Sequence, residues 1–148
     1  MSKSQQQTRG IVVAAVIERD GRILACQRRK GSRHALKWEF PGGKLEAGED
    51  PPEALQRELR EELGIEAKIG PELARYRFTY SNKPPIELIF FQVTEFAGEI
   101  RNEIFEAMQW CRATELPNLD FLEGDVDFVQ RLARRKGSMS MASRSGSR

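Results

Sequence analysis

The chain has 148 residues, of which 39% are hydrophobic and 31% charged, as is typical of one soluble globular domain with its own core. Its longest apolar run, Ile11 to Ile17, is too short to cross a bilayer, and the polar residues 1–9 lack the apolar stretch of a secretory signal. We therefore expect a cytoplasmic protein without a membrane partner.

The small net charge of +2 conceals an uneven distribution. Residues 131–148 hold six of the 24 basic residues and none of the 22 acidic ones, which leaves −4 on the rest of the chain. A nucleic-acid-binding face needs Lys and Arg clustered on the folded body, so no stable nucleic acid partner is expected. Residues 136–148 are rich in Ser, Gly and Arg and predict a disordered basic tail. With a disordered segment at 1–9, this predicts a single domain over residues 10–135.

The first predicted elements form a β-hairpin. Gly10 to Glu18 is an apolar run with β-branched residues and predicts a buried strand. Asp20-Gly21 is a strong turn signal, and Arg22 to Arg28 predicts the returning strand. A polar loop is predicted over 30–37, followed by a Pro-Gly-Gly loop over 39–44.

A helix over residues 51–63 comes next. Asp50 suits the N-cap, Pro51 suits the first helical position, and Glu53 completes a capping-box pattern. Leucine then recurs at every fourth position, which gives one apolar stripe, and Gly64 predicts the helix end.

The second half of the chain alternates strands and turns before a closing helix. Apolar spacing predicts an amphipathic helix over 125–135, with a short turn of helix near Thr114. No internal repeat is present, and the order of elements predicts a mixed α/β fold with several hairpins. Strands are predicted at 67–69, 74–80, 86–94 and 107–111.

The two cysteines, Cys26 and Cys111, lie far apart in sequence and form no CxxC pair. A thiol pair or a metal site is one interpretation, but two half-buried thiols in a reducing compartment are favoured. The single histidine argues against a zinc site.

The predicted helix carries a second, acidic face. Glu58 lies three and four positions before Glu61 and Glu62, and like charges so placed repel by roughly 0.2–0.5 kcal/mol per pair. Arg57 offsets part of this through an i,i+4 pair with Glu61. Such a cluster suits a hard cation such as Mg²⁺, which prefers oxygen ligands. A solvated helix face is the alternative. The preceding loop over 40–43 favours the metal, because its glycines let the backbone approach closely.

The same segment resembles the Nudix box, GX5EX7REUXEEXGU, at every defined position. Seven of these positions are fixed letters, and at about one in fifteen per letter chance agreement is on the order of one in 10⁸ at a given start. The stretches VVAAVIERDGRILACQRR and WEFPGGKLE are similar to MutT-type pyrophosphohydrolases, including the 8-oxo-dGTP and the CTP/5-methyl-dCTP branches. The matching positions are Gly43, Glu49, Arg57, Glu58, Leu59, Glu61, Glu62, Gly64 and Ile65.

The resemblance implies a Nudix α/β/α sandwich with a mixed β-sheet between helices. It implies a hydrolase that splits a nucleoside triphosphate into a monophosphate and pyrophosphate. It also implies that Glu58, Glu61 and Glu62 bind Mg²⁺ or Mn²⁺, helped by a carbonyl of Gly42 or Gly43.

Other site residues follow from the same resemblance. Arg57 is expected to orient a carboxylate, and Glu49 to support the junction of loop and helix. Which carboxylate is the general base stays open. A glutamate outside the box often contributes in this family, and Glu103 or Glu106 is the candidate here, with an ordinary loop residue as the alternative.

Most of the predicted substrate-binding residues have a second interpretation. Arg28 and Arg33 fall where MutT-type enzymes place substrate-contacting residues, and surface arginines are the alternative. Asp125 falls where the family places a base-reading Asn or Asp, although it also suits a helix N-cap. Phe40 and Gly42 complete the predicted set.

The chain departs from the family pattern at one base-contacting position. Pro84, preceded by Lys83, stands where MutT-type enzymes have an arginine, so guanine-style readout is not expected there. Phe78 and Tyr80 either stack on a base or pack into the sheet. The identity of the base is therefore open.

Three functions remain on the sequence alone. One is a pyrophosphohydrolase that removes modified or excess nucleotides, such as 8-oxo-dGTP or cytidine nucleotides. Another is a Nudix hydrolase of a different nucleoside diphosphate: ADP-ribose, a dinucleoside polyphosphate or capped RNA. The third is a non-catalytic nucleotide sensor, but such modules typically lose box glutamates that this chain keeps. A monomer or a homodimer fits each of them.

Overall fold

The computed structural model describes the backbone of residues 10–146 and the side chains of residues 10–135. Its elements in chain order are β1 (Ile11–Arg19), β2 (Arg22–Gln27), β3 (Trp38–Glu39), β4 (Gly42–Lys44), α2 (Pro51–Leu63), β5 (Glu66–Lys68), β6 (Glu72–Phe78), β7 (Ile86–Val93), β8 (Glu95–Ala97), β9 (Ala107–Cys111), the 3₁₀ helix η1 (Ala113–Asn118) and α3 (Glu123–Gly146).

The strands form one large mixed sheet and a small pair. The large sheet has the order β3-β2-β1-β7-β6, with β4 paired to β1 and β9 paired to β2. β1 and β7 run parallel, whereas β1 with β2 and β6 with β7 are antiparallel. β5 and β8 form the separate pair. β1 is thus the central strand, with β7 on one edge and β4 followed by β2 on the other.

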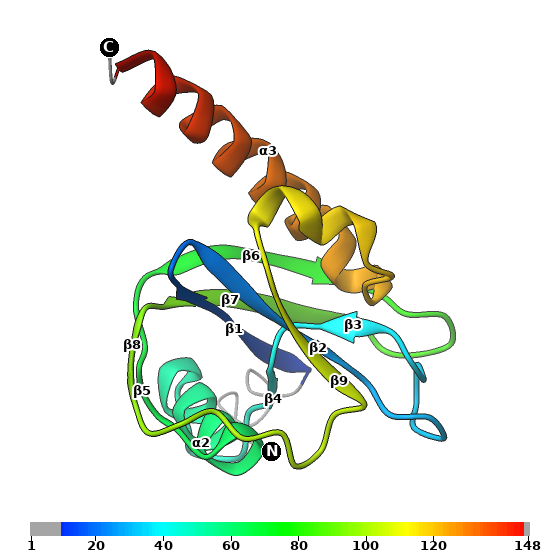
Figure 1. Cartoon of the computed structure of the whole chain (residues 1–148). Coiled ribbons are helices and arrows are strands. Elements are labelled where there is room, and N and C mark those ends of the chain that lie inside the picture. The colour runs from blue at the N-terminus through cyan, green and yellow to red at the C-terminus, as the bar shows by residue number, and fades with distance from the viewer. Residues whose placement is uncertain (1–9, 147–148) are drawn as a thin grey trace.

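Helices cover both faces of this sheet (Figure 1). Alternate residues of β1 pack into two different hydrophobic cores, one on each face of the sheet, because successive side chains of a strand point to opposite faces. Val13, Ala15 and Ile17 pack with α2 and the β5–β8 pair. Ala14 and Val16 pack with η1 and α3. This arrangement confirms the predicted α/β/α sandwich.

The turn of the β1–β2 hairpin and both ends of α2 have the conformations that the sequence predicts. Asp20 (φ 53°) and Gly21 (φ 74°) are both left-handed, as a two-residue turn with the right twist requires. The Asp50 side chain accepts from the Glu53 backbone N–H, and the capping box is complete. Gly64 ends α2 in the left-handed conformation (φ 71°).

The structure adds three short strands that the sequence did not predict: β3, β4 and β8. β4 falls where a loop was expected, because glycine is normally unfavourable in strands. Here Gly42 and Gly43 pair with Ala14 and Val13 of β1. A methyl carbon on Gly42 would lie 2.0 Å from the Val13 carbonyl oxygen, so this pairing requires glycine.

The last helix is longer than predicted. The expected helix over 125–135 is present, but α3 begins at Glu123 and continues to Gly146, where a disordered tail from 136 was expected. Ser costs a helix only about 0.5 kcal/mol and Gly about 1 kcal/mol relative to Ala, and a helix already nucleated by packing propagates easily. The predicted disorder of 1–9 lies outside the described residues. Within the described part of the chain, no helix combines the length and hydropathy needed to span a membrane.

Candidate active site

Two glycines of β4 lie directly against the acidic face of α2. A methyl carbon on Gly43 would lie 2.5 Å from the carboxyl carbon of Glu58, so only glycine leaves room for that carboxylate. The Gly42 backbone N–H donates to Glu62 Oε1 over 3.3 Å. The sheet therefore presents its backbone to the carboxylates of the helix, as the sequence predicts for the loop and helix of the box.

Arg57 organises the charges around this contact. Its Nε and Nη2 donate to the two carboxylate oxygens of Glu49 over 2.7 and 3.0 Å, a bidentate pair. Its Nη1 donates to Glu58 Oε1 over 3.0 Å and lies 3.3 Å from Glu61 Oε2, which confirms the expected i,i+4 pair. The hydrogen bond from Arg57 lowers the pKa of Glu49. Arg57 thus fixes one oxygen of Glu58 and closes the loop that leads into α2.

The three glutamates of the acidic face have different surroundings. The side chain of Glu58 is 15% exposed, whereas that of Glu61 is 58% exposed. Burial, followed by the charge of Glu58, raises the pKa of Glu62. Across the described residues, no group of three or more Asp, Glu, His or Cys side chains is arranged to hold a metal ion. Glu58 and Glu62 are the pair that converges, while Glu61 turns towards Arg57 and solvent.

This pair fits a divalent cation. Two half-buried carboxylates crowd each other, as the raised pKa of Glu62 records; Arg57 pairs with Glu58, whereas no ion pair among the described residues involves Glu62. The donors are oxygens only, which suits Mg²⁺ or Mn²⁺ rather than zinc.

A second charged group, Arg28 with Glu39, lies at β2 and β3, on the same edge of β1 as β4, and the charge of Glu39 adds to the rise in the pKa of Glu62. The Arg28 Nη1 lies 3.2 Å from Glu39 Oε1, and its Nε donates to the Arg33 carbonyl over 2.6 Å. Burial raises the pKa of Glu39, and the charge of Arg28 opposes that rise. The Arg33 side chain makes no hydrogen bond or ion pair with another residue of 10–135. Sequence reasoning missed Glu39, although a carboxylate flanked in sequence by two aromatic residues, Trp38 and Phe40, is a recognisable signal of a buried charge.

Asp125 is the buried polar residue of the α3 side. It is only 5% exposed, and burial, followed by the charge of Glu39, raises its pKa to about 8. The Phe40 backbone N–H hydrogen-bonds to it and opposes the rise. Because α3 begins two residues earlier, Asp125 lies inside the first turn, and the N-cap alternative is wrong. Burial therefore favours the neutral form of Asp125.

Several aromatic residues lie near this carboxyl group or pack against its neighbours. Phe40 is 3% exposed and packs edge-on against Phe128 at 5.8 Å. Phe78 and Tyr80 are half-buried, and their ring centroids are 4.8 Å apart. The ring centroids of Tyr80 and His34 are 5.1 Å apart. Phe78 packs against the core on the α3 side of the sheet, as one alternative predicted, whereas Tyr80 follows β6 and contacts the loop residue His34. Stacking of either ring on a base stays a prediction.

The two glutamates considered outside the box lie on the segment before β9. The Glu103 carbonyl accepts from Arg29, and Glu106 Oε1 accepts from the Lys30 backbone N–H. Within residues 10–135, no hydrogen bond or ion pair joins either side chain to the glutamates of α2. A role for Glu103 or Glu106 at the metal stays a prediction.

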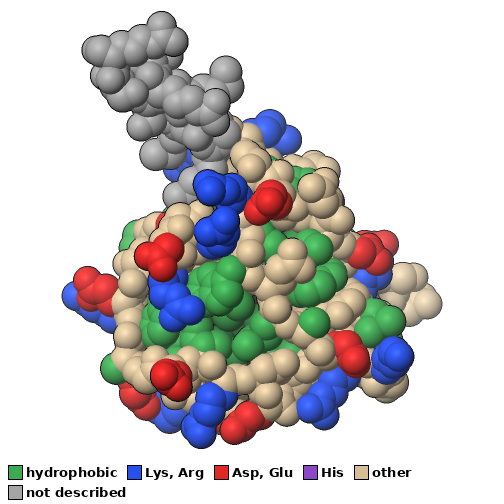
Figure 2. Space-filling view, viewed as in Figure 1, with side chains coloured by type: hydrophobic (Ala, Val, Ile, Leu, Met, Phe, Trp, Pro, Cys, Tyr) green, Lys and Arg blue, Asp and Glu red, His purple; other side chains and the backbone are tan. Residues whose placement is uncertain are grey.

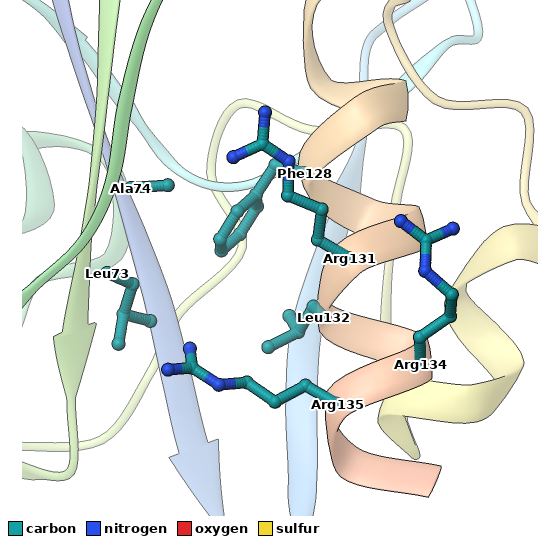
Figure 3. A pocket seen from close by; sticks show the side chains of 7 residues that line it. All are labelled: Leu73, Ala74, Phe128, Arg131, Leu132, Arg134 and Arg135. Atoms are coloured by element: carbon teal, nitrogen blue, oxygen red, sulfur yellow. The ribbon is translucent and has the colours of Figure 1, made fainter. Parts of the chain in front are cut away.

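An open groove of about 500 Å³ lies between β6 and α3 (Figure 3). Leu73 and Ala74 face α3 across it, and arginines of α3 stand at its rim. On the face seen in Figure 2, apolar side chains gather in the middle and charged ones surround them. No predicted site residue lines the groove, so the carboxylate chemistry, rather than the concavity, locates the candidate site. Its lining residues are Leu73, Ala74, Phe128, Arg131, Leu132, Arg134 and Arg135.

Both cysteines are buried and form no disulfide. Burial raises the pKa of the Cys26 thiol, which keeps it protonated and unreactive. The two thiols are therefore unpaired, as predicted, but they are fully buried rather than half-buried.

Comparison with known proteins gives a consistent assignment. The NUDIX domain model matches residues 7–132. A relative named CTP pyrophosphohydrolase, from Escherichia coli, is 41% identical over 119 residues, covering 80% of this chain and 87% of the relative. An 8-oxo-dGTP diphosphatase from Haemophilus influenzae is 44% identical over 122 residues, covering 82% of this chain and 89% of the relative.

Solved structures agree with the sequence comparison. The E. coli ORF135 protein superposes with a TM-score of 0.73 at 41% identity, covering 81% of this chain and 85% of that one. The MutT protein from Methanosarcina mazei superposes with a TM-score of 0.75 at 26% identity, covering 84% of this chain and 93% of that protein.

Proposed function

The chain belongs to the NUDIX domain family and is a Nudix hydrolase, and we propose that it cleaves nucleoside triphosphates to a monophosphate and pyrophosphate. The observation that carries the proposal is the Glu58–Glu62 pair beneath Gly42 and Gly43, braced by Arg57. The relatives named CTP pyrophosphohydrolase and 8-oxo-dGTP diphosphatase support this reaction.

We propose that the family's divalent cation, Mg²⁺ or Mn²⁺, is held by Glu58 and Glu62. Glu61 and a carbonyl of Gly42 or Gly43 would be the further protein ligands. When bound, the cation neutralises the triphosphate and lowers the pKa of the attacking water.

The chain's own residues position the reacting groups. Arg57 holds Glu58 in place and spends its other donors on Glu49, so it braces the site without touching substrate. A carboxylate of α2 accepts the proton of the attacking water. Since phosphoryl transfer depends mainly on positioning and on charge stabilisation, this rigid arrangement supplies most of what the protein contributes to the rate.

The other end of the proposed site reads the base. A neutral Asp125 carboxyl group offers one donor and one acceptor side by side, unlike a carboxylate, which only accepts. Every nucleobase presents an adjacent donor and acceptor, so this carboxyl group can pair with cytosine or 8-oxoguanine, and the relatives named CTP pyrophosphohydrolase and 8-oxo-dGTP diphosphatase support these two bases. Arg28, Arg33 and Phe40 complete the proposed substrate contacts. We therefore propose removal of modified or excess nucleotides as the role.

The test is a substrate panel. Purified protein is incubated with Mg²⁺ and the ordinary NTPs and dNTPs, 8-oxo-dGTP, 5-methyl-dCTP and, as an outgroup, ADP-ribose. Pyrophosphate and monophosphate are quantified separately from orthophosphate. Metal-dependent pyrophosphate release concentrated on one or two bases is expected. Turnover of ADP-ribose alone, or binding of triphosphates without turnover, would contradict the proposal and favour the other two functions.

A further inference from the structure

We propose that Tyr76 and Tyr80 are positioning residues that clamp the first turn of α3 through Gly124 and thereby set the base selectivity of Asp125. This inference rests on the proposed function, because it assumes that Asp125 reads the base. Within residues 10–135, no hydrogen bond joins either tyrosine to the carboxylates of α2, so the clamp concerns selectivity and not the chemical step.

The clamp consists of two hydrogen bonds to one residue. The Tyr76 hydroxyl donates to the Gly124 carbonyl over 2.6 Å. The Gly124 backbone N–H donates to the Tyr80 hydroxyl over 3.0 Å. Both polar groups of Gly124 are therefore bound by side chains from β6 and the turn after it. Burial raises the pKa of both tyrosines, so Tyr76 remains a donor throughout the physiological range.

These bonds replace an ordinary helix cap. The first N–H groups of a helix have no partner within the helix and usually bind the side chain of the N-cap residue. In α3 the Tyr80 hydroxyl accepts from one of them, across 44 residues of sequence. The start of α3 is thus attached to β6 and to the turn after it, in addition to the local hydrogen bond from the Asp125 backbone N–H to the Leu122 carbonyl.

The absence of a side chain at Gly124 allows Tyr80, Leu88 and Phe78 to approach the start of α3 closely. A methyl carbon there would lie 2.7 Å from the Tyr80 hydroxyl, 3.1 Å from Leu88 Cδ1 and 3.3 Å from Phe78 Cδ2. Contacts this short are tighter than nearly all observed for a Cβ atom. Any larger residue at 124 would displace the helix start or the tyrosine.

The clamp acts on Asp125 through a single peptide bond. Asp125 follows Gly124 directly, and its carboxyl group meets the Phe40 backbone N–H, near Glu39. A shift of the helix start moves the donor and acceptor of Asp125 relative to the base. Paired donor–acceptor contacts lose their discrimination when their geometry is lost, whereas contacts with phosphates elsewhere in the site are unaffected.

The experiment compares Tyr76→Phe and Tyr80→Phe with the wild-type chain. Each substitution removes one hydroxyl and keeps the ring. Val129→Ala is the matched control: Val129 is 2% exposed on the same helix, so its truncation weakens packing but leaves the clamp. Dissociation constants for CMP, UMP, AMP, GMP and inorganic pyrophosphate are measured by calorimetry, which needs no turnover.

We expect the Kd of the preferred monophosphate to rise about tenfold in each Tyr→Phe variant, with little change for the other bases and for pyrophosphate. With triphosphates, KM rises and kcat is retained. Amide exchange at Gly124 and Asp125 accelerates in Tyr80→Phe and not in Val129→Ala.

Unchanged ratios of the dissociation constants in both Tyr→Phe variants would overturn the clamp, as would an equal loss of selectivity in Val129→Ala. A wild-type chain that does not discriminate between bases would overturn it as well. If selectivity in binding changes as expected but no triphosphate is hydrolysed, the clamp stands and the proposed reaction fails. Normal hydrolysis with unchanged ratios would instead leave the proposed reaction standing and overturn the clamp.

Discussion

The two helices that frame the proposed site begin in different ways. α2 is capped by its own neighbours in sequence, Asp50 and Glu53. α3 is bound at its start by Tyr76 and Tyr80, which are 48 and 44 residues away from Gly124 in the chain. A local cap forms with the helix itself, whereas the clamp of α3 requires the folded sheet. The position of Asp125 is therefore a property of the tertiary structure.

The carboxyl groups of the two helices also have different electrostatic surroundings. At α2, Arg57 keeps Glu49 and Glu58 paired with a positive charge. At α3, burial raises the pKa of Asp125 to about 8, with no cationic side chain among its causes. In the proposed function, the first region holds a cation and phosphate, and the second reads a neutral base. Carboxyl groups of one domain take opposite roles because their surroundings differ.

Glu62→Gln tests the cation side and has the largest expected effect. The amide keeps the shape but removes the charge, so kcat with the best triphosphate should fall about 10²–10³-fold. Turnover is measured with Mg²⁺ at saturating substrate. The control is Glu66→Gln, which removes an exposed ion pair with Arg60 beyond the end of α2. A Glu62→Gln enzyme with normal kcat would remove Glu62 from the chemistry.

Arg57→Lys tests whether the charges must be positioned as well as present. Lysine keeps the charge but cannot bind Glu49 in bidentate fashion while holding Glu58, so kcat should fall about 10–100-fold and more Mg²⁺ should be needed. Activity is measured as a function of Mg²⁺ concentration, which gives both kcat and the Mg²⁺ concentration needed for half-maximal activity. Arg60→Lys, three residues further on the same helix and 55% exposed, is the control and should behave as wild type. Equal behaviour of the two variants would show that charge alone suffices.

Asp125→Asn tests the neutral side. The amide offers a donor and an acceptor at every pH, so catalysis should survive while the ratio of kcat/KM between bases changes by about tenfold. The ratio is measured on the two best substrates of the panel. Asp127→Asn, which alters an exposed ion pair with Arg131 on the same helix, is the control. An unaltered ratio would show that Asp125 does not read the base.

The same substitution predicts a change in the pH dependence of stability. The folded-state pKa of Asp125, about 8, is raised above its ordinary value of 3.8, so the folded state binds the extra proton between these values. The free energy of unfolding must then fall as pH rises through this window. Asp125→Asn should flatten the decline of Tm measured from pH 5 to pH 8. Glu39 and Glu62, whose pKa values are also raised, leave a residual slope. A slope as steep as that of the wild-type chain would contradict the buried neutral carboxyl.

The sequence predicted the parts of the molecule that local rules determine. The bounds of α2, its caps and the contact of Arg57 with Glu61 follow from neighbours within a few positions, and the structure reproduces them. β4 was missed because its glycines pair with β1 for reasons of distant packing. The clamp on Gly124 was missed for the same reason, since nothing near residue 124 in the sequence indicates a tyrosine partner.

Buried charge was harder to predict than charge on a helix face. The spacing of Glu58, Glu61 and Glu62 shows a shared face but does not show that Glu61 is mostly exposed. Glu39 and Asp125 influence each other across 86 positions, and only the fold brings them together. A sequence therefore identifies candidate carboxylates, whereas their protonation depends on the tertiary structure.

Removing residues 137–148 should have the smallest effect. Among the described side chains, the buried part of α3 extends to Leu132, which is 3% exposed, and every proposed site residue lies at or before Asp125. Activity on the best triphosphate should therefore stay within about twofold of the full chain. Truncation before residue 131 is the comparison, because it also removes Leu132 from the core and should cost about 2–5 kcal/mol of stability. A large loss of kcat in the shorter deletion, with Tm unchanged, would show that the basic end of α3 takes part in the reaction and that the site extends along this helix well beyond Asp125.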